Sequence, residues 1–130
     1  MKPHEIAGVE HVAIASFTPR LLAEWYVDHL NFMLIHDTGD TLYLQAANRV
    51  MLEFVQADTH QPPPAMRSVG IRHIALAVAD LDAATAALEA RGLFFPDEMI
   101  VRPGIRLQFF RDPEGNVLHL VERMCPLESA

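Results

Sequence analysis

An eight-residue segment occurs twice in this chain. Gly8-Val9-Glu10-His11-Val12-Ala13-Ile14-Ala15 returns as Gly70-Ile71-Arg72-His73-Ile74-Ala75-Leu76-Ala77. The glycine and the histidine stand at the same places in both copies, and most other positions are identical or exchange only Val, Ile and Leu. The copies lie 62 residues apart (70 − 8). Self-similarity at a fixed spacing indicates a duplicated structural unit.

The residues after each copy also follow a common order. A helical stretch comes first, and three short apolar runs follow it. The last run is 50–55 in the first half and 116–121 in the second. We therefore predict an α+β fold made of two βαβββ modules. Each module opens on a strand that carries a histidine and closes on a strand that carries Glu or His.

The first module is predicted over 8–56. Thr18 is expected to be the N-cap of a helix over 19–30, with Pro19 at its first position. A run rich in Val, Ile and Ala precedes this helix, and short apolar runs follow it. The predicted strands are 8–16, 32–36, 41–45 and 50–56.

The second module is predicted over 70–123, after a linker over 57–69. Three consecutive prolines favour an extended linker. Asp80 is expected to be the N-cap of a helix that ends at Arg91-Gly92. The predicted strands are 70–79, 93–101, 104–111 and 116–123, with a tight turn at 112–115 before the last. Both modules are expected to form one domain over 1–130.

The composition narrows the class of protein. At 130 residues and 51% hydrophobic, the chain fits one compact domain with a sizeable core. A formal charge of −7 and only ten Lys and Arg argue against a nucleic-acid surface. Cys125 stands alone, the N-terminus lacks an apolar signal core, and no apolar run approaches the ~20 residues of a membrane span. We expect a cytoplasmic protein without membrane association.

The chain resembles the vicinal oxygen chelate superfamily, which includes glyoxalases, bleomycin-resistance proteins and extradiol dioxygenases. The resemblance is carried by Gly-x-x-His-x-Ala-x-Ala at both strand starts, by Val78-Ala79-Asp80-Leu81-Asp82, and by Phe109-Phe110-Arg111-Asp112-Pro113-Glu114-Gly115-Asn116-Val117-Leu118. It implies two modules whose curved sheets face each other around a cleft. It also implies metal ligands on the first and last strands of each module, and a small-molecule substrate.

Carried onto this sequence, the family's ligand positions fall on His11 and Glu53 in the first module and on His73 and His119 in the second. Metal-dependent lyases and isomerases of the family usually carry a glutamate where His119 stands.

Glu122 is the other candidate on the last strand. Internal alignment pairs His119 with Glu53, and it pairs Glu122 with Gln56. Side chains alternate along a strand, so positions 119 and 122 point to opposite faces. The predicted ligand is therefore His119.

Three imidazoles and one carboxylate suit a divalent ion such as Zn, Fe, Ni or Mn. A single histidine on an apolar strand is more often a hydrogen-bonded core group than a ligand. Here two histidines occupy equivalent repeat positions, and ligand-type residues occupy both closing positions. This symmetry favours metal binding.

Two classes of function remain open at this stage. The first is a metal-dependent lyase or isomerase in which Glu53, the only carboxylate of the set, acts as base; a dioxygenase is less favoured. The second is a metal-free binding protein of the bleomycin-resistance kind. The resemblance also implies a homodimer. Four arginines are candidates for contact with a substrate anion: Arg49, Arg102, Arg106 and Arg111.

Overall fold

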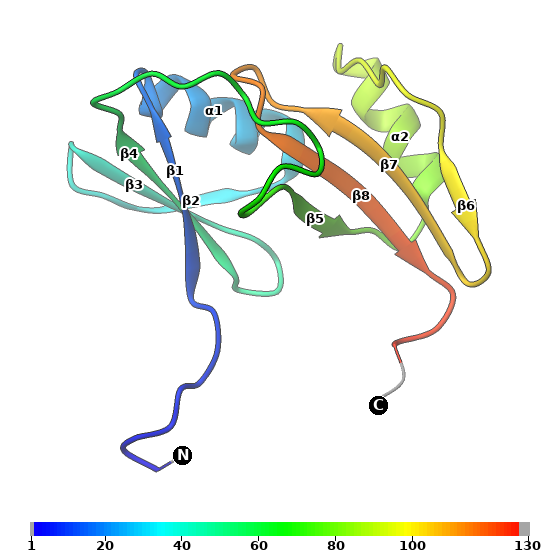
Figure 1. Ribbon diagram of the computed structural model, residues 1–130, viewed down its shortest axis with the longest axis horizontal. Helices are drawn as coiled ribbons and strands as arrows, with labels where there is room; N and C mark the ends of the chain where they lie inside the picture. Colours follow the sequence, from blue (N-terminus) through cyan, green and yellow to red (C-terminus); the bar gives the residue numbers. More distant parts are fainter. Residues whose placement is uncertain (1, 128–130) are drawn as a thin grey trace. The chain divides into compact units, whose positions relative to one another are not determined.

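The computed structural model describes residues 2–127. The chain divides between Gln61 and Pro62 into two compact units, and this division lies inside the predicted linker. In the described part of the chain, each unit holds one helix and one four-stranded sheet (Figure 1). The predicted α+β class and the βαβββ order of both modules are confirmed.

Unit 1 contains one mixed sheet with the strand order β1-β4-β3-β2. The outer strand β1 runs parallel to β4, and the other neighbours are antiparallel. Its elements are β1 (His11–Ser16), α1 (Pro19–Leu30), β2 (Met33–Asp37), β3 (Thr41–Gln45) and β4 (Met51–Gln56).

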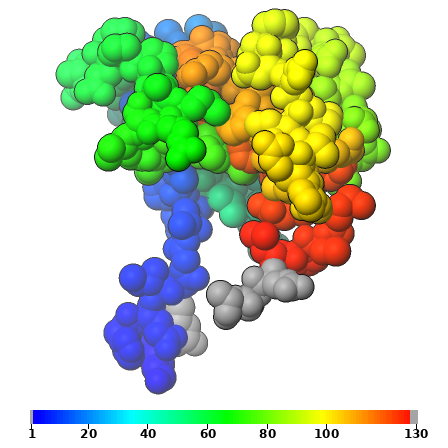
Figure 2. Space-filling view, turned by 45° about the vertical axis from the view of Figure 1, so that its right-hand side comes forward, coloured from blue at the N-terminus to red at the C-terminus, as the bar shows by residue number. Residues whose placement is uncertain are grey.

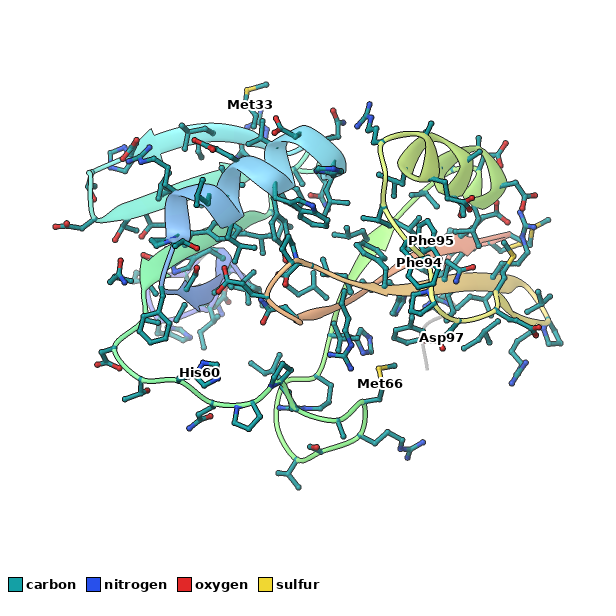
Figure 3. All side chains as sticks on the ribbon, turned by 90° about the horizontal axis from the view of Figure 1, so that it is seen from above. Met33, His60, Met66, Phe94, Phe95 and Asp97 are labelled. Carbon is teal, nitrogen blue, oxygen red and sulfur yellow. The ribbon has the colours of Figure 1, made fainter. Side chains whose placement is uncertain are left out.

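The two faces of this sheet differ because side chains alternate along each strand. Leu42, Leu44, Leu52 and Phe54 are buried, and the ring of Phe54 meets that of Tyr26 on α1 at 5.1 Å between centroids. The residues between them on β3 and β4 lie on the face away from the helix. At the edge of the sheet, the side chain of Met33 points outward and is 68% exposed (Figure 3).

Helix α1 begins and ends where the sequence predicts, at Pro19 and Leu30. Thr18 holds the N-cap position, and its carbonyl accepts from Leu22 N. However, the Thr18 side chain makes no capping hydrogen bond. The Ser16 hydroxyl instead accepts from the amide of Thr18 at 2.9 Å, which orders the residue before the helix.

Unit 2 repeats this arrangement with the strand order β5-β8-β7-β6, and β5 runs parallel to β8. The predicted N-cap Asp80 is confirmed, because its carboxylate accepts from Ala83 N at 3.1 Å. The elements are β5 (Ile74–Ala77), α2 (Leu81–Ala90), β6 (Ile100–Arg102), β7 (Ile105–Arg111) and β8 (Val117–Arg123).

Two predicted strands of unit 2 are much shorter in the structure. The prediction 70–79 shrinks to β5, whose partner β8 begins only at Val117, so residues 70–72 have no strand beside them. The prediction 93–101 shrinks to β6. Pro96 has no amide hydrogen for a ladder, and Phe95, labelled in Figure 3, packs edge-on against Phe110 instead of extending the sheet. Except for the buried Leu93, residues 93–102 lie at least partly on the surface of this unit, yellow in Figure 2.

The predicted tight turn at 112–115 leads into β8. Gly115 N donates to Asp112 O at 3.0 Å, and the buried Asp112 carboxylate accepts from the amides of Glu114 and Asn116. A Cβ on Gly115 would meet Pro63 Cγ at 2.7 Å, so the linker packs directly on this turn. Among residues 2–127, no helix is long and apolar enough to cross a membrane.

Candidate metal centre

In unit 1, the structure brings His11 and Glu53 together. His11 is the first residue of β1, and Glu53 pairs with Ala13 on the parallel strand β4. His11 Nε2 lies 3.5 Å from Glu53 Oε1. This separation is longer than an ordinary N–H···O hydrogen bond of about 2.7–3.2 Å. The two groups therefore face each other on the sheet surface away from α1 without a close mutual bond.

Tyr43 fixes the Glu53 carboxylate from the neighbouring strand. Tyr43 pairs directly with Glu53 in the β3–β4 ladder, and its hydroxyl donates to Glu53 Oε2 at 2.6 Å. This bond to the carboxylate raises the pKa of Tyr43 above its usual range. The tyrosine thus stays protonated and holds one carboxylate oxygen, leaving Oε1 directed at His11.

Glu10 orients the imidazole of His11. His11 Nδ1 lies 3.0 Å from Glu10 Oε1. Because a carboxylate oxygen only accepts, Nδ1 carries the hydrogen of this bond. In the neutral ring, Nε2 then keeps its lone pair on the side of Glu53. An imidazole held through one nitrogen by an oxygen acceptor is the usual arrangement of metal-binding histidines.

In unit 2, the structure brings His73 and His119 together. His73 directly precedes β5, and His119 lies on β8, where it pairs with Ala75 and Phe109. The two imidazole centroids are 4.6 Å apart, and the Phe109 ring lies 4.7 Å from His119. His119 is only 6% exposed. Its burial lowers the pKa of the imidazole, so the ring is held in the neutral form that binds metals.

The backbone also sets the tautomer of His119. His119 Nδ1 lies 3.2 Å from the carbonyl oxygen of Leu120. A carbonyl cannot donate, so Nδ1 carries the hydrogen and Nε2 keeps its lone pair. In both His11 and His119, Nε2 therefore keeps a lone pair that can bind a metal ion, although the acceptor for Nδ1 differs.

Glu122, the competing candidate, lies on the opposite face of β8. Its carboxylate accepts from Leu81 N at 2.8 Å and from the guanidinium of Arg106 at 2.9 and 3.0 Å. The Arg106 bonds are the main reason that the pKa of Glu122 falls to about 2. Gln56, its counterpart in the repeat, likewise reaches the backbone near the start of α1, by donating to Phe17 O. Glu122 thus holds the start of α2 in place.

Imidazole nitrogens with lone pairs and carboxylate oxygens suit a borderline divalent ion. Unit 1 offers His11 and Glu53, and unit 2 offers His73 and His119. Each unit supplies two of the four predicted ligands. Among residues 2–127, no three His, Cys, Asp or Glu side chains form a group that could hold a metal ion. Within either unit, the predicted ligands therefore occur only as a pair.

Two residues that support the predicted ligands were not found from the sequence. Alternation along β3 places Tyr43 on the other face of the sheet from its neighbours Leu42 and Leu44. Its pairing with Glu53, however, depends on the hairpin register. Glu10 belongs to the repeated octapeptide, at the one position where the copies differ in charge, Glu10 against Arg72. That difference was the available signal.

Comparison with known proteins assigns the chain to a family. A family model for the Glyoxalase/Bleomycin resistance protein/Dioxygenase superfamily matches residues 8–120. The chain belongs to this superfamily, as its motifs indicate. Its members bind small-molecule substrates and typically a divalent metal ion. A search of curated proteins found no match.

Solved structures agree with this assignment. A glyoxalase family protein from Enterococcus faecalis is 26% identical, with a TM-score of 0.77 over 89% of this chain and 98% of that chain. A glyoxalase/dioxygenase from Nostoc punctiforme is 15% identical, with a TM-score of 0.78 over 95% of each chain. A lactoylglutathione lyase from Agrobacterium tumefaciens is 21% identical, with a TM-score of 0.68 over 93% of this chain and 96% of that chain. The last two show the fold alone.

Proposed function

We propose that this protein is a metal-dependent lyase or isomerase whose ligands are His11, Glu53, His73 and His119, and whose small substrate binds through neighbouring oxygen atoms. The observation that carries the proposal is that the hydrogen bonds of His11 and of His119 select the same tautomer. Each ring uses Nδ1 to donate to an oxygen and leaves the Nε2 lone pair free. Superfamily membership supports the same reading.

A divalent ion held by these residues would act as a Lewis acid on the substrate oxygens and stabilise a developing anion. Glu53 is the base in this proposal, because it is the only carboxylate of the set. The Tyr43 hydroxyl occupies Oε2, so Oε1 is the atom that accepts the substrate proton. Burial lowers the pKa of His119 and so favours the neutral imidazole, which can bind a metal ion.

Metal titration of the purified, chelator-treated protein tests the proposal. Isothermal titration with Zn²⁺, Ni²⁺ and Mn²⁺ should show binding to the wild type. His11→Ala and His119→Ala should each weaken binding by more than the about 10–100-fold that loss of an outer hydrogen-bond partner costs. His4→Ala, in the exposed segment before β1, is the matched control and should bind as the wild type does.

Glu122→Ala tests the choice between the two candidates on β8. It should keep the metal affinity, although its fold is weakened at the start of α2. Loss of metal in Glu122→Ala with retention in His119→Ala would contradict the ligand set. If no metal binds to the wild type and none of the variants matters, the binding-protein reading of the bleomycin-resistance kind replaces the enzyme.

We also propose a homodimer, on the basis of the family resemblance. Light scattering at micromolar concentration should give twice the 14.6 kDa chain mass. A monomer mass under these conditions removes this part of the proposal.

A further inference from the structure

The arginines on β6 and β7 have oxygen acceptors within the protein. Arg102 donates to Val101 O at 2.8 Å. Arg106 donates to Glu122 and to Asp82, and Arg111 donates to Gly115 O at 2.6 Å. These guanidinium groups therefore bind oxygen atoms of the protein itself.

Arg72 differs from them. Its Nε and Nη1 atoms are buried from solvent and have no hydrogen-bond partner among residues 2–127. An arginine side chain keeps its positive charge at every pH at which proteins fold, and all its nitrogens are donors. Buried donors of a charged group are costly unless an acceptor satisfies them. The unmatched donors of Arg72 can be satisfied by an oxygen-bearing group from outside the described chain, since the residue as a whole is only part-buried.

The backbone next to Arg72 sets the position of this guanidinium. A Cβ on Gly70 would lie 3.0 Å from Arg72 Nη2, so the charged group packs against the bare Cα of Gly70. Gly70 has φ +114°, a conformation that L side chains rarely adopt. The glycine shared by both copies of the repeat thus leaves room for an arginine head group in the second copy.

The repeat also shows that this position is adapted differently in each unit. Its counterpart in unit 1 is Glu10, whose carboxylate is matched to His11 Nδ1. In unit 2 the residue before the histidine has the opposite charge, and two of its donors have no partner in the described chain. At the same position of the repeat, unit 1 has a carboxylate with a hydrogen-bond partner, and unit 2 has a guanidinium with two donors that have none in the described chain.

We propose that Arg72 is the centre of an oxyanion site that binds a carboxylate or phosphate group of a small ligand. Guanidinium donors form short, charge-assisted hydrogen bonds with both groups. Exclusion from water strengthens such bonds. The site needs no metal ion, so it can be tested independently of the proposed metal centre.

Thermal unfolding of the chelator-treated protein tests this site. The probes are sodium phosphate and sodium malonate, each compared with sodium chloride at the same ionic strength. At least one probe should raise the Tm of the wild type, since a ligand that binds only the folded state stabilises it. Arg72→Gln should weaken the apparent affinity about tenfold or more. Arg102→Gln, on an exposed arginine with a carbonyl acceptor, should leave it unchanged.

A second variant guards against a loss of folding. Arg72→Met keeps the length of the side chain and removes its charge, so it should unfold at a Tm at or above that of the wild type without anion. It should also lose the response to anions. Stabilisation by malonate alone assigns the site to carboxylates, and stabilisation by phosphate alone assigns it to phosphates. Stabilisation that survives in Arg72→Met and Arg72→Gln, or no response to either probe in the wild type, overturns the site.

Discussion

The hydroxyl of Tyr43 is the shortest side-chain contact of the candidate base, at 2.6 Å from Glu53 Oε2. Tyr43→Phe removes this donor and keeps the ring that packs edge-on against His11 at 5.6 Å. We expect an about 10–100-fold loss of metal affinity, as for other partners that orient a ligand. Isothermal titration with Zn²⁺ measures it, and circular dichroism checks that the fold is retained.

Tyr26→Phe is the matched control for this substitution. Tyr26 is fully buried between α1 and the sheet, on the face opposite to Glu53. Removing its hydroxyl should change stability and leave metal affinity alone. Equal metal affinities in Tyr43→Phe and the wild type would show that the hydroxyl does not position Glu53 for binding.

The Glu122 carboxylate makes stability depend on acid pH. Its pKa is about 2 in the folded protein, against an ordinary value of 4.5, chiefly because Arg106 and the amide of Leu81 bind its charged form. A lowered folded-state pKa stabilises the fold above the ordinary value, and this contribution is lost as pH falls toward about 2. Urea unfolding from pH 6 to pH 2 should show the free energy of unfolding decreasing with acid.

Glu122→Gln isolates this contribution. The variant should be less stable than the wild type at pH 6, and the difference should shrink toward pH 2, where the wild-type carboxylate becomes protonated. Asp37, whose pKa is also about 2 beside Arg20, continues to titrate in both proteins. A pH-independent difference between the two proteins would mean that the charge of Glu122 does not stabilise the fold.

At this scale, the sequence predicts residues whose role follows from alternation or repetition. The repeat picks out His11 and His73, and strand parity separates His119 from Glu122, which the structure places on opposite faces of β8. The roles of Tyr43 and Arg72 could not be predicted in this way. They depend on cross-strand register and on burial, which one sequence does not reveal.

The two helices provide a comparison at the scale of elements, because only one has a side-chain cap. Asp80 accepts from Ala83 N, whereas Thr18 makes no side-chain capping bond. Asp80→Ala should therefore lower the free energy of unfolding by about 1 kcal/mol. Thr18→Ala should change it by less than about 0.5 kcal/mol.

Urea unfolding of both variants at pH 7 measures the difference. The wild type and the two single variants suffice, because the substitutions lie in different units and far apart in the chain. Equal losses in both variants would contradict the assignment of the cap.

The elements that the sequence predicts well have local signals at their ends. Pro19 and the left-handed Asn31 bound α1, and Asp80 starts α2. The segment 93–101 has an apolar pattern that suits a strand, yet only Ile100–Arg102 joins the sheet. Phe95 in this segment packs against Phe110 instead, and a packing partner that lies far away in sequence leaves no local signal.

At the scale of the whole molecule, the proposed ligand set predicts how many metal ions one chain binds. The proposed set has four ligands, and protein sites for such an ion use about four. Metal analysis should therefore give one ion per chain. His11→Ala and His119→Ala should each weaken the binding of this ion, because both residues belong to the proposed ligand set. The double variant should cost less than the sum of the two single losses, since losses within one ligand set are coupled. Two ions per chain, with His119→Ala keeping one at unchanged affinity, would mean that each unit binds metal on its own and that the repeat encodes two independent sites.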